Sequence, residues 1–339
     1  MESAIPGHLT VERTRPRRIP DDYQPPYPAF VARSRPEVQR VVMAYFGLQF
    51  GDADPAAALA ALDDAFGGTD GPGHHERTRH VDESVHEIVC IAYWDEPETF
   101  DRWFADHRET WVGDSAAADG LGRWIEVIRP AAEEYETLFS SLGRPEGIAV
   151  VADGFSADIQ EHGYWGGMRD RIPLSQHDAM PPVGEPVVER DGARVRVRPA
   201  GGLCLIRSGQ DYADTEGDER AMYLGDVEPP LRTGMDFLRA DGGAVGCYAN
   251  RYLTVLDADG ATTDRTFGMS WWRSLDKLER WAESHPTHVA IFGAAMKYLS
   301  TMGPAAKLRL YHEVSVVPAD GQHFEYVNCD ERTGLLGAL

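Results

Sequence analysis

The sequence lacks paired cysteines, long apolar runs and nucleotide-binding glycine fingerprints. Its four cysteines lie far apart and form no C-x-x-C pair, which excludes the usual zinc-ribbon spacings and covalent C-x-x-C-H heme attachment. No G-x-G-x-x-G or Walker loop opens a helix, so nucleotide binding has no support. No apolar segment approaches the roughly 18 residues that suggest a membrane span, and the start carries charge and proline where a secretory signal needs an apolar run. We therefore expect a reduced, cytoplasmic protein without a membrane partner.

Basic residues are scarce as well. The chain of 339 residues has 33 Lys plus Arg against 55 Asp plus Glu, a formal net charge of -22. Such a surface repels phosphate backbones and anionic lipid, so we expect no nucleic acid partner. The rest of the composition, with 42% hydrophobic and 26% charged residues, is that of a globular protein with a sizeable core.

The chain divides into an arm and two halves of alternating strands and helices. Residues 1–36, rich in proline and arginine, predict an extended N-terminal arm, followed by halves at 37–150 and 151–339 within one integrated unit. Segments rich in β-branched and aromatic residues predict strands at 38–50, 85–94, 202–209, 244–256, 266–274 and 307–317. Helical spacing predicts helices at 54–66, 97–107, 218–240 and 275–284, and residues 67–80 predict a loop.

Two segments are similar to each other. Aligning "WDEPETFDRWFADH" (94–107) with "WRSLDKLERWAESH" (272–285) pairs four identical residues, two Trp, one Arg and one His. In both, an aromatic strand end leads into a helix. An internal repeat favours two α+β units that share a core over a doubly wound parallel sheet.

Two histidines stand at a helix junction in "LERWAESHPTHVAIFGAAMKYL" (278–299). One helix should end near His285, and Pro286 can begin the next at its first position, where proline is favoured. His288 then falls in the first turn, on one face with Ile291, Phe292, Ala295 and Leu299. A neutral imidazole facing an apolar slot suits an axial heme ligand. The alternative is a core histidine with satisfied ring nitrogens.

Two strands carry a further pair of candidates. In "KLRLYHEVSVV" (307–317) the alternation makes His312 the single titratable group on an otherwise aliphatic face. It suits a proton shuttle, and a buried histidine bonded to backbone is the alternative. In "GLCLIRSGQD" (202–211), Ser208 shares a face with Cys204 and Ile206 and can face the same interior.

Two polar segments are less informative. "EHGYWGGMRDRIP" (161–173) has poor helix and strand signal, so we expect an ordered loop in which Arg169 and Arg171 either line a pocket or remain solvated. "HHERTRH" (74–80) is similar to a metal-binding tract, but its spacing fits no site and we expect a surface loop.

Together, these strings resemble the aldoxime dehydratases, the heme-containing family that includes the phenylacetaldoxime dehydratases. The resemblance is carried by "MESAIPGHL", "YQPPYP", "EHGYWGGMRDR", "LIRSGQDYAD", "GMDFLR", "RSLDKLERWAESHPTH" and "LRLYHEVSV", which span nearly the whole chain. It implies an α+β fold of the dimeric α+β barrel type, built from two ferredoxin-like repeats, and a homodimer.

The resemblance also implies a reaction: dehydration of an aldoxime, R-CH=N-OH, to a nitrile, with the oxime nitrogen bound to ferrous heme. Carried over by motif, His288 of "ESHPTH" is the proximal ligand of a non-covalent heme b. His312 of "LYHEV" is the distal acid-base residue, and Ser208 of "IRSG" and Arg171 of "MRDR" complete the pocket. Glu136 in "EYETL" also lies in a string like the family's, with its role left open.

Other heme proteins are the alternatives. A peroxidase-like or chlorite-dismutase-like enzyme also uses a distal arginine, so Arg171 does not separate it from a dehydratase. A non-catalytic heme carrier or sensor needs His288 but has no need of His312 and Ser208 on one pocket wall.

Overall fold

The computed structural model describes residues 1–82 and 85–338. Its strands join in one twelve-stranded sheet of order β5-β11-β8-β10-β9-β2-β3-β1-β4-β12-β7-β6. The strands are β1 Val42–Phe50, β2 His74–Val81, β3 His86–Trp94, β4 Gly122–Ile128, β5 Tyr135–Phe139, β6 Val187–Asp191, β7 Arg194–Arg198, β8 Leu203–Asp211, β9 Cys247–Leu256, β10 Thr262–Trp272, β11 Arg309–Val317 and β12 Gln322–Val327. The α-helices are α1 Ala56–Phe66, α2 Pro97–Val112, α3 Gly167–Arg171, α4 Gly217–Met222, α5 Glu228–Asp241, α6 Leu275–Ser284 and α7 Pro286–Met302.

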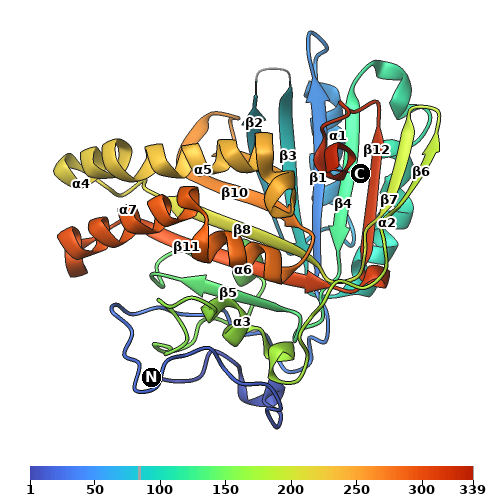
Figure 1. The fold of residues 1–339 in the computed structure, drawn as a ribbon. Helices are drawn as coiled ribbons and strands as arrows, with labels where there is room; N and C mark the ends of the chain where they lie inside the picture. The colour runs from blue at the N-terminus through green and yellow to red at the C-terminus, as the bar shows by residue number, and fades with distance from the viewer. Residues whose placement is uncertain (83–84, 339) are drawn as a thin grey trace.

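Two groups of four strands within this sheet have the same order. In β2-β3-β1-β4 and in β9-β10-β8-β11, the first strand in sequence lies between the third and the fourth. Helices follow the first and third strand of each group. The groups run in different directions in Figure 1 and meet where Thr78 and Arg79 of β2 pair with Val255 and Thr254 of β9.

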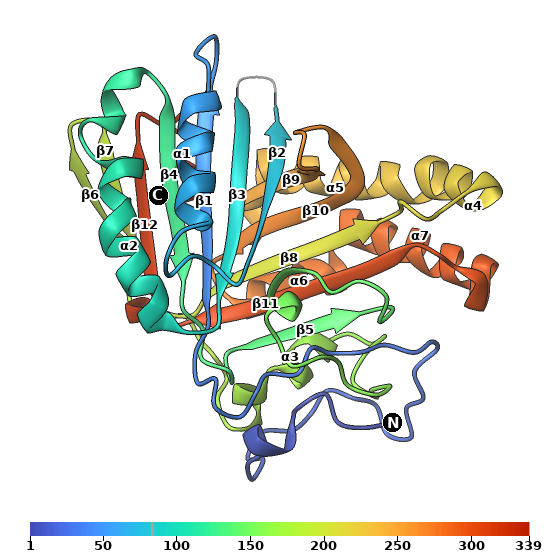
Figure 2. The ribbon, with the colours of Figure 1, turned by 180° about the vertical axis from the view of Figure 1, so that it is seen from behind.

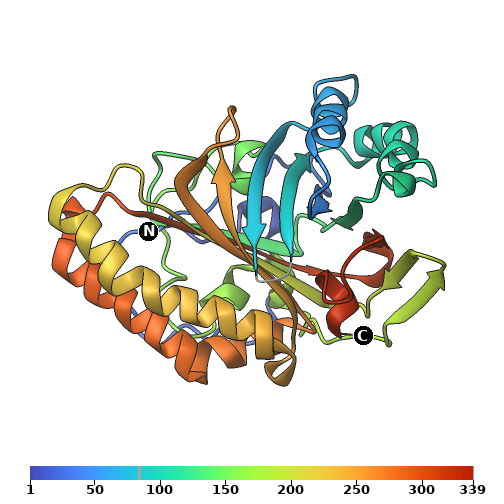
Figure 3. The same ribbon diagram turned by 90° about the horizontal axis from the view of Figure 1, so that it is seen from above.

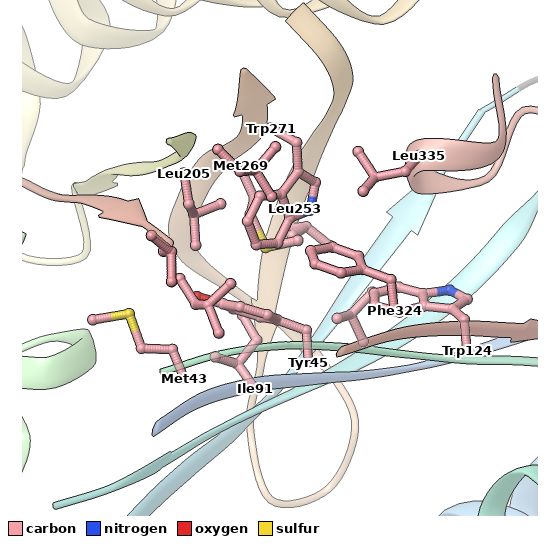
Figure 4. Packing of buried hydrophobic residues seen from close by; sticks show 14 of the residues in the cluster. Met43, Tyr45, Ile91, Trp124, Leu205, Leu253, Met269, Trp271, Phe324 and Leu335 are labelled. Atoms are coloured by element: carbon pink, nitrogen blue, oxygen red, sulfur yellow. The ribbon is translucent and has the colours of Figure 1, made fainter. Parts of the chain in front are cut away.

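The inner faces of both groups share one hydrophobic core (Figure 4). Tyr45 of β1, Leu205 of β8, Trp271 of β10 and Phe324 of β12 all lie in it and are almost fully buried. The Trp271 ring lies edge-on to the rings of Tyr45 and Phe324, at centroid distances of 6.1 and 5.0 Å. Burying each such side chain contributes about 1.5–3 kcal/mol, so this core ties the two groups together.

The helices cover the outer faces of the two groups. On the first group, Phe66 of α1 and Trp103 of α2 stack at 5.4 Å over β1. On the second, α5 and α7 run side by side (Figure 3), and α6 packs against α7. Among the described residues, no helix is both long and apolar enough to cross a membrane.

Most of the expected elements occur, with one error at residues 67–80. The second half of that expected loop is strand β2, which pairs with β3 along its whole length and with β9 at one end. The sequence of β2 does not look like a buried strand because the side chains on its inner face are polar: Thr78 is fully buried, and Glu76 turns inward to pair with Arg207 and Arg265. A strand whose inner face is polar does not show the alternation of apolar and polar residues by which a strand is predicted from sequence.

Candidate active site

His312 and Ser208 face each other on adjacent strands. In the register of β8 and β11 they are direct partners, and on the other side His312 pairs with Leu138 of β5. Directly opposed residues in antiparallel strands project from the same face. Both side chains are half-buried, and they share a face of the sheet with Cys204 and Val314, which pack against residues of α5 and α6.

The His312 ring is held by a buried ion pair. Arg171 donates to Glu136 twice, from Nε to Oε2 at 2.7 Å and from Nη2 to Oε1 at 3.0 Å. The side chains of Arg171 and Glu136 are 3% and 1% exposed. His312 Nε2 lies 2.9 Å from Glu136 Oε1 and 2.9 Å from Arg171 Nη2. That nitrogen therefore either donates a hydrogen bond to the carboxylate or accepts one from the guanidinium.

Glu136 is the acceptor in this group. Burial by itself raises its pKa, but the charges of Arg171 and His312, with their hydrogen bonds, hold the pKa of Glu136 below its usual value. An ionised carboxylate can only accept, so it favours the ring form with a proton on Nε2. Nδ1 of His312 has no hydrogen bond among the described residues, and is the ring atom left for a substrate.

The expected ordered loop at 161–173 contains a helical turn, α3, and its two arginines have different partners. Arg171 reaches the site, whereas Arg169 pairs with Glu279 of α6 at 2.6 Å and donates to the Ala179 carbonyl at 2.8 Å. Both arginines are paired with carboxylates, and neither stands free in solvent. The 74–80 cluster lies on β2, and no group of three or more His, Cys, Asp or Glu within the described ranges is arranged to hold a metal ion.

The helix junction places its two histidines in different roles. His285 ends α6 and caps α7, accepting from the Thr287 N–H at 3.4 Å, while its ring stacks on Phe237 at 4.3 Å. His288, in the first turn of α7, lies against the Trp281 and Trp165 rings at 4.7 and 6.0 Å. His285 is thus occupied as a cap, whereas the His288 ring lies between tryptophan rings.

His288 fits the single protein ligand that a heme needs. Its Nδ1 lies 2.7 Å from the Ala282 carbonyl, which fixes the proton on Nδ1 and leaves the Nε2 lone pair free. Burial lowers the pKa of His288 to about 4, so the ring is neutral. Although α7 is rich in apolar residues, Tyr298 is its one buried residue. Its other apolar side chains are partly exposed, so an apolar cofactor can pack against the helix.

Sequence reasoning missed two features of this site. The contact of Glu136 with His312 joins residues 176 positions apart, and β5, which carries Glu136, was not expected as a strand. Trp165, beside His288 and Phe292, lies in a glycine-rich segment without periodicity. The motif resemblance was the available signal for Glu136.

With this geometry in place, comparisons with known proteins identify the class. Residues 44–335 match the family described as haem-containing dehydratases. The chain belongs to this family, and its cofactor is heme. The resemblance seen in the sequence is thus confirmed.

The similarity to particular relatives extends over the full length. The chain is 46% identical to an aliphatic aldoxime dehydratase of Rhodococcus erythropolis, over 99% of this chain and 98% of the relative. It is 34% identical to a phenylacetaldoxime dehydratase of Bacillus sp. (strain OxB-1), over 94% of each. The crystal structure of an aldoxime dehydratase in complex with butyraldoxime superposes with a TM-score of 0.94 at 44% identity, covering 99% of this chain and 96% of that one.

Proposed function

We propose that this protein removes water from aliphatic aldoximes to form nitriles, with a non-covalent heme b held by His288. The observation that carries the proposal is the face shared by His312 and Ser208, with His312 held by Glu136 and Arg171. The aliphatic substrate class is supported by 46% identity to an aliphatic aldoxime dehydratase against 34% to a phenylacetaldoxime dehydratase.

The reaction breaks the N–O bond of R-CH=N-OH and then removes the hydrogen on carbon. Hydroxide leaves poorly, so its oxygen must be protonated as the bond breaks. His312, as the imidazolium, donates this proton from Nδ1, while the Ser208 hydroxyl holds the oxygen in place. A heme held by His288 would, in its ferrous form, supply the electron density that weakens the N–O bond. Neutral Nδ1 of His312 then accepts the proton from carbon, which gives the nitrile and one water.

Glu136 and Arg171 prepare His312 for both steps. The Glu136 carboxylate accepts from Nε2 and stabilises the imidazolium, so that Nδ1 is the atom that loses and regains the proton. Arg171 keeps that carboxylate ionised and in position through two hydrogen bonds. In this role Glu136 orients the base, as the third member of a catalytic triad does.

The architecture follows the same proposal. We infer that residues 37–150 and 151–339 are ferredoxin-like repeats of one unit, preceded by the arm at 1–36, and the matching strand orders support this. A homodimer is inferred from the family resemblance, and light scattering on the purified protein tests it. Four free cysteines agree with a reduced, cytoplasmic location.

Nitrile formation tests the proposed reaction. Heme-loaded protein, reduced with dithionite or left air-oxidised, is incubated with butyraldoxime and with phenylacetaldoxime, and nitriles are measured by gas chromatography. We expect butyronitrile from the reduced protein and little from the oxidised one. Turnover of peroxide or chlorite without any nitrile would favour the other heme enzymes. No turnover of any of these substrates would favour a heme carrier.

A further inference from the structure

The N-terminal arm crosses the segment that carries Arg171 (Figure 2). Next to α3, the Gln176 carbonyl accepts from the N–H groups of Thr14 and Arg15 at 2.9 and 3.1 Å. The Gln176 side chain accepts from Val11 N–H at 3.1 Å and donates to the Leu9 carbonyl at 2.9 Å. Arm residues 9–15 are therefore fixed at the C-terminal side of α3.

Asp170 fixes the arm again within α3 itself. Its carboxylate accepts from the backbone N–H groups of Arg18, at 2.8 Å, and of Ile19, at 3.0 Å, and from the Tyr164 hydroxyl at 2.8 Å. The residue is 2% exposed. Asp170 directly precedes Arg171, so a shift of one backbone moves the other.

Two glycines make room for the arm. Gly166 has φ +96°, and a Cβ there would overlap the side chain of Arg18. Gly163 has φ +77°, and a Cβ would lie 2.8 Å from the Tyr23 hydroxyl. Other residues rarely adopt these backbone conformations, and a side chain at either position would displace the side chain of Arg18 or of Tyr23, both in the arm.

The arm also supports Arg171 from its other side. Arg171 Nη1 donates to the Glu161 carbonyl at 2.6 Å, and the Glu161 carboxylate accepts from Ala4 N–H at 3.1 Å. The backbone that receives Arg171 and the helix that carries it are thus both attached to residues 4–19.

We propose that Asp170 is a positioning residue for the dehydration, which clamps the arm to α3 and so places the Arg171 guanidinium between Glu136 and His312. This inference rests on the proposed function. It assigns the arm a part in the site, although no arm residue contacts Glu136 or His312 among the hydrogen bonds of the described residues.

Replacing Asp170 by Asn tests the clamp. An amide keeps the size, but Arg18 N–H reaches both carboxylate oxygens, at 3.1 and 2.8 Å, so the NH2 group of Asn faces at least one arm N–H in either orientation. We expect this donor-to-donor contact to shift α3. Misplacing a group in an active site by about 1 Å can reduce turnover by on the order of 10²-fold, and we expect a 10-fold to 100-fold loss of kcat with heme retained. Asp158→Asn is the matched control, because Asp158 also accepts from an arm N–H, that of Ala29 at 3.1 Å, but lies outside α3. It should leave kcat unchanged.

Two measurements separate positioning from mere stabilisation. In an Arg171→Lys background, Asp170→Asn should lower kcat less than about twofold further, because residues that act through one another are not additive. The C–O stretch of the CO-loaded ferrous protein should shift in Asp170→Asn and not in Asp158→Asn, since it responds to charge near the distal side. Tyr164→Phe removes one of the three hydrogen bonds and should give a smaller change in the same direction, which also serves if Asp170→Asn folds poorly.

The inference is wrong if Asp170→Asn lowers the melting temperature but keeps the wild-type kcat and C–O stretch. It is also wrong if the losses of Asp170→Asn and Arg171→Lys simply multiply. Failure of the proposed function has a different signature: the wild-type protein itself would make no nitrile, whereas the C–O stretch would still report whether Asp170 positions Arg171.

Discussion

The two arginines of α3 allow a matched test of the site. Arg171 pairs with Glu136, and Arg169 pairs with Glu279 through hydrogen bonds of 2.6 to 3.0 Å. Both pairs are bidentate and largely buried, but only Glu136 contacts His312. Charge-neutral replacements of the two glutamates therefore cause similar damage to the fold and different damage to the chemistry.

Glu136→Gln should cost both stability and turnover. Removing one partner of a buried pair leaves the other charge uncompensated, which typically costs about 3–5 kcal/mol, and the 3% and 1% exposure of this pair places it in that range. The variant also removes the negative charge beside Nε2 of His312 and turns an NH2 group, in place of one carboxylate oxygen, toward Arg171 or His312. General acid catalysis contributes about 10² to 10⁴-fold, so we expect kcat to fall by on the order of 10²-fold.

Glu279→Gln should cost stability alone. Arg169 is 14% exposed and Glu279 5%, so partial solvation of the remaining arginine keeps the loss at or below about 3 kcal/mol. Arg169 contacts Glu279 and the Ala179 carbonyl, neither of which touches His312. The kcat of Glu279→Gln should stay within about twofold of wild type, because residues without shared partners are only weakly coupled.

Urea unfolding at pH 7 gives the free energies of unfolding, and nitrile formation by the reduced, heme-loaded variants gives kcat. Heme content is measured in each preparation, so that turnover is expressed per heme. Equal losses of kcat in the two variants would show that the activity change reflects general loosening of α3. Wild-type turnover in Glu136→Gln would remove Glu136 from the mechanism.

Three further predictions concern the histidines and Ser208. His288→Ala should lose the Soret band on purification whereas His285→Ala keeps it, and normal heme content in the first variant would end the axial assignment. His312→Leu fits the aliphatic strand face, so it should retain heme and lose about 10² to 10⁴-fold in turnover. Ser208→Ala should lose less, because only a positioning hydrogen bond is removed. Near wild-type turnover in heme-loaded His312→Leu would point to another proton donor. In heme-free protein, burial lowers the pKa of His288 from 6.5 to about 4. As the pH falls from 6.5 to 4, the unfolded chain therefore binds a proton at His288 that the folded protein does not bind. The free energy of unfolding should fall by up to about 3 kcal/mol over this range. Urea midpoints at pH 7.5 and 4.5 should show a smaller drop for His288→Gln than for wild type, and an equal drop would contradict the assignment.

Alternation and capping made much of the second half predictable from sequence. His312 was placed on the same face as Leu310 and Val314 because a strand with one apolar face has a definite register. The break between α6 and α7 followed from proline chemistry at Pro286, and the structure has His285 as the cap. Both features depend on residues that are close together in the sequence, so they can be predicted without knowing the contacts between distant segments.

The partners of His312 were not accessible to local rules. Glu136 and Arg171 come from a five-residue strand and a five-residue helix, both too short for a periodic signal. Their contacts with His312 span 176 and 141 positions. Family motifs identified these residues, whereas the salt bridge between them required coordinates.

The reverse faces of β8 and β11 explain why the site and the polar strand β2 belong together. Arg207 and Glu313, which flank Ser208 and His312, are direct partners in the same register and point to the opposite side. There the Tyr93 hydroxyl accepts from Arg207 at 3.0 Å and donates to Glu313. Strands alternate their faces, so fixing Arg207 and Glu313 behind the sheet also fixes the two residues in front.

This second network comes from the first half of the chain. Tyr93 lies on β3, and Arg207 also pairs with Glu76 of β2. Buried charges persist only when paired, and here each pairing joins the two strands of the site to the other four-stranded group. Glu76, one of the polar residues that made β2 unrecognisable as a strand, therefore holds β8 from behind through Arg207, and Tyr93 of β3 holds Glu313 of β11. Glu136 of β5 and Arg171 of α3 hold His312 from in front.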